Sequence, residues 1–481
     1  MKKLLSILAL SLCAIIQVQA QEGYNCFGII AGKDATADGS VLMGHNEDDD
    51  PEQMLNIYLV GATDAVKPGM RPDGTPIKLY GTSSASYIWA EFPRMDVADS
   101  FINEHGVCVA SDGCPSCEDT LDTTDGGVLY DIRVNVAMFA HSSREAVEII
   151  GSMVEKYGYA GSGRTYLVAD PDEGWLVSVV QGRHWVAQRV PDDKVVAIPN
   201  HYIIDKVDLS DTDNFAGSAD LVEYATARGW YDPQTDGEFS FRKAYSREST
   251  KRSDSNRLRR TAVLNILTGL QLDGDTDNYE FAYDPAHKLT VQDIMQALSS
   301  HSTSLSYLHD FEYDPQRHPA KCSVCNNNTI LSSVFQLRSW LPRRIGCIMW
   351  NAMGHPCSEV YIPWYLGIRK VPQGWGRYAT AEEAGEKHFS DTNEMQVNHP
   401  DGNYWKYTSR WENVAADYAA AQEGAATLDE FQQKIFEEQA QLDARLTKKF
   451  VKRNGKLRRQ GKVGKIVSKW LEERYAEYDQ L

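Results

Sequence analysis

Short apolar runs that end in turn residues dominate the first two hundred residues of the chain. Residues 26–46 contain two such runs, and Asp38-Gly39 between them is a strong hairpin signal. A second hairpin is predicted within residues 100–111. Turn residues divide residues 165–200 into three or four more apolar runs. The pattern predicts antiparallel β-sheet.

Other stretches carry apolar residues at helical spacing instead. Residues 126–158 fit two consecutive helices, and residues 256–270 and 290–301 fit one helix each. A long helix is predicted for residues 427–450 near the C-terminus. Strands followed by helices and then by more strands favour an α+β fold in which sheets lie between helical layers.

The first twenty residues are typical of a secretory signal. Two lysines precede an apolar run with a small-residue ending at Ala20. Cleavage there would leave residues 21–25 in front of Cys26. We therefore expect residues 1–20 to be a signal peptide and residues 21–25 a short propeptide. The expected location is the periplasm or the outside of the cell.

The charge of the chain limits its partners. The 481 residues carry a formal charge of -18, so phosphate backbones would be repelled and nucleic acid is not an expected partner. No integral membrane segment is expected, because no later apolar run reaches about twenty residues. Basic residues gather in residues 445–469, which hold eleven Lys or Arg and no acid. This stretch is a solvated helix face, or it contacts the acidic surface of the chain or an anionic envelope polymer.

Eight cysteines follow the signal, and an oxidising compartment favours disulfides among them. One alternative is a structural zinc ion held by two pairs of cysteines three residues apart, and the other is free thiols. The two pairs are Cys114 with Cys117 and Cys322 with Cys325. A nucleophilic Cys26 would have to stay unpaired, which leaves at least one other thiol without a partner.

Cys26 opens the first predicted strand, where removal of the propeptide would expose its α-amine. That amine titrates at roughly 7.7 to 8.0, so a nucleophile and its base would share one residue. The alternative is a small buried hydrophobic residue on a first strand. His45 and Asp48 close the neighbouring strand of the hairpin, within reach of the amine.

Two asparagines occupy positions that suit an oxyanion. Asn103 lies at the tip of the second hairpin, and Asn200 follows an apolar run. An asparagine amide donates hydrogen bonds without adding charge, so either side chain could stabilise a developing oxyanion. Both positions also suit an ordinary turn.

The string NCFGIIAGKDATADGSVLMGHNEDD, residues 25–49, resembles the opening of the cysteine-dependent dipeptidases of the dipeptidase A type. These are relatives of the secernins among the N-terminal-nucleophile hydrolases. The resemblance continues through INEHGVCVASDG, VADPDEGWLVSVVQGRHWVAQRVPDD and YIPWYLGI, and so covers most of the chain after the signal. It implies a four-layer αββα sandwich, a cysteine exposed by propeptide removal, and hydrolysis of short peptides without a metal or other cofactor.

The resemblance also implies roles for single residues. Asp48 matches the aspartate that holds the amine in related bile-salt and penicillin V acylases, and His45 replaces their arginine. A carboxylate is expected to bind the free amine of the substrate. The implied catalytic residues are Cys26, Asp48, Asn103, Asn200 and Arg257, and the implied substrate-binding residues are His45, Glu47 and Glu104.

We expect residues 26–415 to form the hydrolase domain and residues 416–481 a helical extension, suited to packing or to homo-oligomer assembly. The expected function is an exported cysteine-type dipeptidase that acts on short peptides through a thioester. An acylase or amidase of the same superfamily would share these catalytic residues. The third interpretation is a non-catalytic protein that binds the cell envelope through the basic stretch.

Overall fold

The computed structural model describes residues 25–49, 55–69, 75–92, 97–301, 317–319, 322–376, 414 and 417–481. The expected signal peptide and residues 21–24 of the expected propeptide lie outside this part of the chain.

The first of two antiparallel sheets in the described part contains the predicted N-terminal hairpin. In this sheet β1 pairs with β2, and the turn contains Gly39 at a φ of 78°, which favours glycine. The hairpin prediction is therefore confirmed. The strand order is β10 (Val195–Ile198), β1 (Phe27–Ala31), β2 (Val41–Asp48), β12 (Thr329–Leu337), β13 (Cys347–Met353) and β14 (Ile362–Tyr365).

The second sheet contains the other predicted hairpin, which joins β5 to β6. The apolar runs predicted within residues 165–200 supply β7, β8 and β9, and also β10 of the first sheet. The strand order is β11 (Phe215–Gly217), β9 (Trp185–Val190), β8 (Gly174–Gly182), β7 (Tyr159–Ala169), β6 (Cys108–Gly113), β5 (Val97–Asn103), β4 (Tyr87–Phe92) and β3 (Asn56–Val60).

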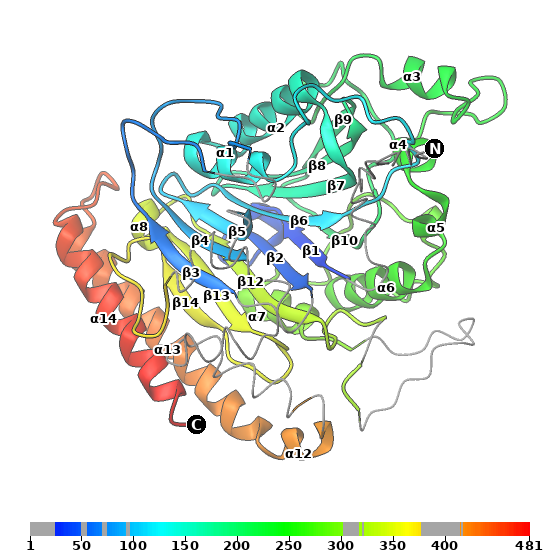
Figure 1. Ribbon diagram of the computed structural model, residues 1–481. Coiled ribbons are helices and arrows are strands. Elements are labelled where there is room, and N and C mark those ends of the chain that lie inside the picture. The colour runs from blue at the N-terminus through cyan, green and yellow to red at the C-terminus, as the bar shows by residue number, and fades with distance from the viewer. Residues whose placement is uncertain are drawn as a thin grey trace, which may run out of the picture.

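The two sheets lie face to face, because apolar side chains from both form one core cluster. Gly28 permits a close approach of the sheets: a Cβ there would lie 2.4 Å from Leu167 Cδ2. Helices α1 (Asp131–Phe139) and α2 (Ser143–Tyr157) cover the outer face of the second sheet, and α6 (Asp254–Thr268) and α7 (Val291–Leu298) cover the first (Figure 1). The predicted α+β fold with four αββα layers is confirmed.

Several short helices lie in the connections between these strands and helices. They are η1 (Lys33–Ala35), α3 (Leu221–Ala227), α4 (Phe241–Tyr245), α5 (Glu248–Lys251), η2 (Thr276–Asn278) and α8 (Arg343–Gly346). A further short helix, α12 (Tyr418–Glu423), precedes the long C-terminal helices.

Two long C-terminal helices, α13 (Ala425–Phe450) and α14 (Gln460–Tyr478), pack against β14 at the edge of the first sheet (Figure 1). Trp364 donates a hydrogen bond of 2.9 Å to the hydroxyl of Tyr475. The side-chain amide of Gln432 bonds both backbone groups of Tyr361, at 2.7 and 3.2 Å. The basic side chains of residues 445–469 are all exposed, as a solvated face requires. Among the described residues, no helix is both long and apolar enough to cross a membrane.

Candidate functional site

Cys26 lies directly before β1, buried at one end of the sandwich with 7% of its surface exposed. Its Sγ lies 3.7 Å from the backbone oxygen of Asp48 at the end of β2. Burial raises the pKa of the Cys26 thiol well above its usual range, and three nearby carboxylates raise it further. With Asn25 still attached, the sulfur is therefore held as a neutral thiol.

Side chains alternate along β2, so its last four residues point in two directions. His45 faces the second sheet, where its Nε2 lies 3.2 Å from Oδ1 of Asp112 on β6. This buried pair joins the two sheets beside Cys26. Asn46 faces the other way and donates 2.9 Å hydrogen bonds to the carbonyls of Leu298 and Val324.

The Asp48 carboxylate also points away from the second sheet. Asn326 donates a short hydrogen bond to its Oδ2, and Thr329 donates one of 2.8 Å to its Oδ1. Burial raises the pKa of Asp48 to about 7, although both hydrogen bonds lower it. The group therefore titrates near neutral pH, and its position is fixed by two donors.

A buried guanidinium on α6 bridges the residues around Cys26. Nη1 of Arg259 donates to the backbone oxygens of Asn25, at 2.6 Å, and Cys26, at 2.9 Å. Its Nη2 donates to the side-chain oxygens of Asn200, at 3.0 Å, and Asn256, at 2.7 Å. Arg259 thus connects the expected scissile bond to Asn200.

The sequence predicts Arg257 in this role, and that prediction is wrong by two residues. Arg257 donates to the carbonyl of Gly274 at 2.9 Å and lies 3.8 Å from Asp254. Successive helical residues are about 100° apart, so side chains two positions apart point in nearly opposite directions. The structure therefore brings Arg259, and not Arg257, to Cys26.

Asn103 and Glu104 are also placed away from the site. Along the β5–β6 hairpin, Cys108 lies between Asn103 and Asp112. Asp112 is four residues further along β6 than Cys108, which corresponds to about 13 Å in a strand. The Asn103 amide donates hydrogen bonds to the carbonyls of Ala137 in α1 and Ala140 just after it. Its oxygen accepts from the backbone N–H groups of His105 and Val107 in its own turn. Glu104 accepts from the backbone N–H of Ser86 at 2.9 Å. Asn103 therefore closes the β5–β6 turn, and Glu104 binds the backbone just before β4. These contacts correct the expected oxyanion role of Asn103 and the expected substrate role of Glu104.

A second arginine faces Cys26 from β7. Arg164 donates to the hydroxyl and carbonyl of Ser111, at 2.9 and 3.3 Å. Burial lowers the pKa of Arg164, but the nearby side chains of Tyr159, Tyr166, Glu47 and Cys26 raise it further than burial lowers it. Arg164 therefore stays protonated. Glu47 is also buried, on the same strand as His45. The site therefore combines two guanidinium groups with several carboxylates around one thiol.

The eight cysteines after residue 25 are all described, and all have free thiols, so the expected disulfides are absent from the structure. The expected zinc arrangement is also wrong. Cys114 lies near the carbonyl of Pro199 and Cys117 near that of Ala244, while Cys325 lies 3.4 Å from His318. The two cysteine pairs do not meet.

Sequence reasoning missed four residues of the site. Asp112 and Arg164 belong to the second sheet, and their approach to Cys26 depends on how the sheets stack. Asn326 arrives from the turn before β12. The alternation of β6 offered a weak signal, because Asp112 is a charged residue at the end of a buried strand. Those missed are Asp112, Arg164, Arg259 and Asn326.

A comparison with protein families decides the assignment. The model described as Peptidase family C69 matches residues 120–417, more than half of the chain. The chain belongs to this family. The resemblance to cysteine-dependent dipeptidases is thereby confirmed, and this C69 member is a peptidase.

Curated relatives of this C69 peptidase carry dipeptidase names. Probable dipeptidase B of Streptococcus pyogenes serotype M1 is 25% identical over 421 residues, which cover 83% of each chain. Dipeptidase A of Lactobacillus helveticus is 23% identical over 376 residues, covering 73% of this chain and 77% of that protein. Probable dipeptidase of Salmonella dublin is 27% identical over 365 residues, covering 73% and 82%.

Solved structures similar to this C69 peptidase include two hydrolases. A variant of conjugated bile acid hydrolase from Clostridium perfringens aligns with a TM-score of 0.36 and 12% identity over 68% of this chain and 89% of its own. Penicillin V acylase from Agrobacterium tumefaciens aligns with a TM-score of 0.34 and 12% identity over 70% and 85%.

Proposed function

We propose that the chain is an exported cysteine-type dipeptidase whose nucleophile is Cys26, made N-terminal by removal of residues 1–25. The observation that carries this proposal is the surroundings of the buried Cys26. Its Sγ lies 3.7 Å from the backbone oxygen of Asp48, Arg259 donates to its backbone oxygen, and the nearby carboxylates of Glu47, Asp112 and Asp48 act on the pKa of its thiol. Curated relatives named as dipeptidases support short peptides as substrates. The secretory pattern of the first twenty residues supports export to the periplasm or the outside of the cell.

Release of Asn25 would change the electrostatics of the thiol. The new α-ammonium would lie among the carboxylates that raise the pKa of Cys26 in the longer chain. A positive neighbour favours the thiolate, which is the reactive form of cysteine. Asp48 is the carboxylate best suited to hold this ammonium, because its own position is fixed by Asn326 and Thr329.

In the proposed reaction, Sγ attacks the carbonyl carbon of the substrate peptide bond and the carbonyl oxygen becomes an oxyanion. Asn200 is a suitable donor to this oxyanion. Its Oδ1 already accepts from Arg259, and its Nδ2 makes no hydrogen bond within the described residues. An oriented amide donor of this kind lowered the barrier by about 3 to 4 kcal/mol in one measured protease.

The tetrahedral species then collapses. The C–N bond breaks, the α-ammonium gives its proton to the departing amine, and an acyl thioester remains on Cys26. Water attacks the thioester while the α-amine takes up a proton from it, and the C–S bond then breaks. This releases the acid and restores the Cys26 thiolate beside its α-ammonium. Glu47 and Asp112 are placed to hold the free amine of a dipeptide, because both are buried carboxylates close to the sulfur.

The same groups support self-processing. Arg259 donates to the carbonyl of Asn25, which is the carbonyl that would be attacked when the peptide bond before Cys26 is cut. A guanidinium in this position would stabilise the oxyanion formed there. The peptide bond between Asn25 and Cys26 would therefore be the first bond that the site cuts.

The test is the mature N-terminus of the exported protein, measured by intact mass and N-terminal sequencing, together with hydrolysis of a dipeptide panel. We expect a chain that begins at Cys26 and cuts dipeptides. A stable, active chain that begins before Cys26 would overturn the proposed nucleophile. Cleavage of acylated amino acids but not of dipeptides would instead assign an acylase.

A further inference from the structure

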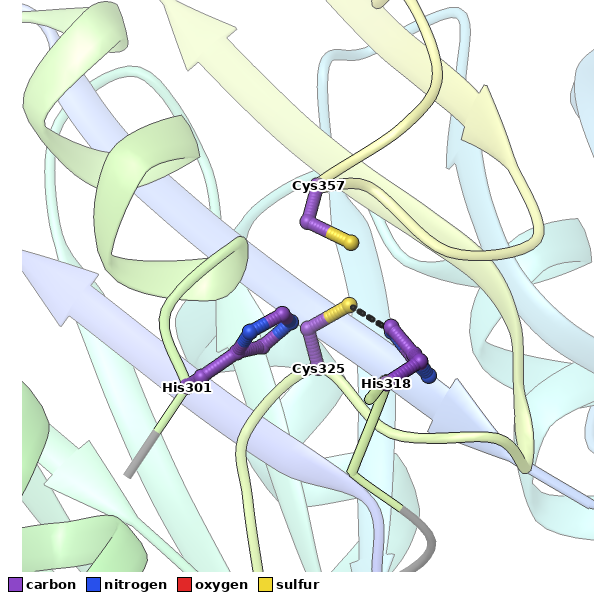
Figure 2. Close-up of side chains that lie close together, drawn as sticks. All are labelled: His301, His318, Cys325 and Cys357. Carbon is purple, nitrogen blue, oxygen red and sulfur yellow. Dashed lines mark hydrogen bonds between the residues drawn. The ribbon is translucent and has the colours of Figure 1, made fainter. Parts of the chain in front are cut away.

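Four side chains outside the Cys26 site converge on one point (Figure 2). His301 follows α7, His318 and Cys325 precede β12, and Cys357 lies between β13 and β14. Their ligand atoms all lie within 4.8 Å of one another. In the described part of the chain, this is the group of histidine, cysteine and carboxylate side chains that could hold a metal ion.

We propose that these residues bind a structural Zn²⁺ ion. Two thiolates and two imidazoles form one of the common tetrahedral zinc sets. Zinc bonds of about 2.3 Å to sulfur and about 2.0 Å to nitrogen place the donor atoms of a tetrahedron about 3.3 to 3.8 Å apart. The observed separation of His318 Nε2 and Cys325 Sγ is 3.4 Å.

The surroundings orient both histidines for this role. Nδ1 of His318 lies 2.6 Å from the side-chain oxygen of Asn327, which fixes the proton on Nδ1 and leaves the lone pair of Nε2 facing Cys325. Nδ1 of His301 lies 3.5 Å from the hydroxyl of Tyr418. Its Nε2 is buried and makes no hydrogen bond of ordinary geometry within the described residues. A metal ion would satisfy this nitrogen.

The site is structural, because the chain supplies all four donors and leaves no position for water or substrate. Three segments far apart in the sequence would be fastened by one ion: the end of α7, the turn before β12 and the connection from β13 to β14. The backbone N–H of Cys325 already donates to the carbonyl of Ser300 at 3.1 Å, so these segments are in contact.

The zinc site would also hold part of the Cys26 site in place. Asn326 directly follows the ligand Cys325 and donates to Oδ2 of Asp48, and Thr329 donates to Oδ1. Fixing the turn at residue 325 therefore fixes the two donors of the Asp48 carboxylate. Zinc here acts on the position of Asp48 and takes no part in bond cleavage.

The first measurement is the metal content of the full chain, purified in reducing buffer without chelator and analysed by plasma mass spectrometry. We expect about one zinc per chain in the wild type and in Cys322→Ser, a half-buried cysteine outside the cluster. We expect at least about a tenfold loss of bound zinc in Cys357→Ser and in His301→Ala. Absence of zinc from the wild type after incubation with zinc chloride, or full zinc in Cys357→Ser, would overturn the proposal.

A second measurement stands if the variants do not fold. Wild-type protein loaded with Co²⁺ should show the intense visible bands of a tetrahedral ion and a sulfur-to-cobalt charge-transfer band in the near ultraviolet. Bands typical of six-coordinate cobalt would refute the site. So would an intact Cys325–Cys357 disulfide in protein freshly isolated without reductant, seen as a linked peptide by mass spectrometry. None of these readouts depends on peptide hydrolysis, so they succeed or fail separately from the proposed function.

Discussion

The Cys26 site and the proposed zinc site both contain thiols, and the neighbours of these thiols differ. Cys26 lies among carboxylates and receives the guanidinium of Arg259 at its backbone. Cys325 and Cys357 lie among imidazoles. Carboxylates can hold an ammonium group by hydrogen bonds, and guanidinium groups can hold acceptor oxygens. Imidazoles and thiols together are borderline-soft metal donors. The chemistry of each buried cysteine therefore follows from the groups around it.

The two groups are nevertheless physically connected, because Asn326 follows one of the zinc-site thiols and bonds Asp48 of the other site. Substitutions in one group, in the other and in the connection between them should therefore give three different results.

Cys26→Ala should lower dipeptide hydrolysis by about 10⁴-fold or more, because no other nucleophile is placed to replace the sulfur. Zinc content should stay at its wild-type value. Steady-state kinetics with a matched Cys117→Ser variant, whose thiol lies away from both groups, provides the control. Substantial turnover by Cys26→Ala would remove the difference between the two thiol sites.

Arg259→Lys should reduce kcat/KM by about 10²-fold, since a lysine ammonium cannot bridge two carbonyls and two side-chain oxygens in a fixed plane. It should also leave part of the protein unprocessed before Cys26. Arg257→Lys, two residues away on the same helix, should be near wild type in both assays. Equal losses in the two variants would contradict the assignment of the bridging role to Arg259.

Asn326→Ala removes one of the two donors to Asp48 and should cost about 1 to 3 kcal/mol of interaction, or roughly a 10- to 100-fold loss of kcat/KM. Burial raises the pKa of Asp48 to about 7, and the Asn326 hydrogen bond lowers it. Loss of that bond should therefore move the acid limb of the pH–rate profile to higher pH. Zinc should stay bound. An unshifted profile would show that Asn326 supports the fold but does not position the carboxylate.

The stability of the unprocessed Cys26→Ala protein should depend on Asp48. Its pKa rises from 3.8 to about 7 on folding because of burial, so the protonated form favours the folded state. This contribution is complete below pH 3.8 and is lost as pH rises through about 7, a change of roughly 4 kcal/mol. Asp48→Asn should flatten the pH dependence of urea unfolding over this window, and an unchanged slope would contradict the burial of an ionisable group.

Asn103→Ala should have the smallest effect on catalysis. The side chain closes the β5–β6 turn, so its removal should lower the free energy of unfolding by about 1 to 3 kcal/mol. kcat per folded molecule should be unchanged, whereas Asn200→Ala should lower kcat. A selective loss of kcat in Asn103→Ala would restore its predicted oxyanion role.

Most of the fold could be predicted because its signals are local. The turn at Asp38-Gly39 and the alternating strands beside it define the first hairpin within about twenty residues, and helical spacing located α2, α6 and α7. A local signal also placed Asp48 next to Cys26, since antiparallel pairing of β1 and β2 brings the two ends together.

The rest of the site depends on contacts that local patterns do not encode. Arg257 and Arg259 lie in one string, and only the orientation of α6 on the sheet selects between them. Asp112 meets His45 across the stacking of two sheets. The zinc-site residues are separated by 17, 7 and 32 positions, so no short motif joins them. His301 and Cys357 can be recognised as metal ligands only when the fold brings the three segments together.

The covering of β14 has a consequence for solubility. This strand ends the first sheet, and an uncovered edge strand is a template for pairing with another chain. Gln432 occupies the backbone groups of Tyr361 next to the strand, and α14 lies over the strand itself. Without these helices, the apolar edge of the sheet would be open to pairing with a strand of another chain. The C-terminal helices thus protect the sheet from intermolecular strand addition.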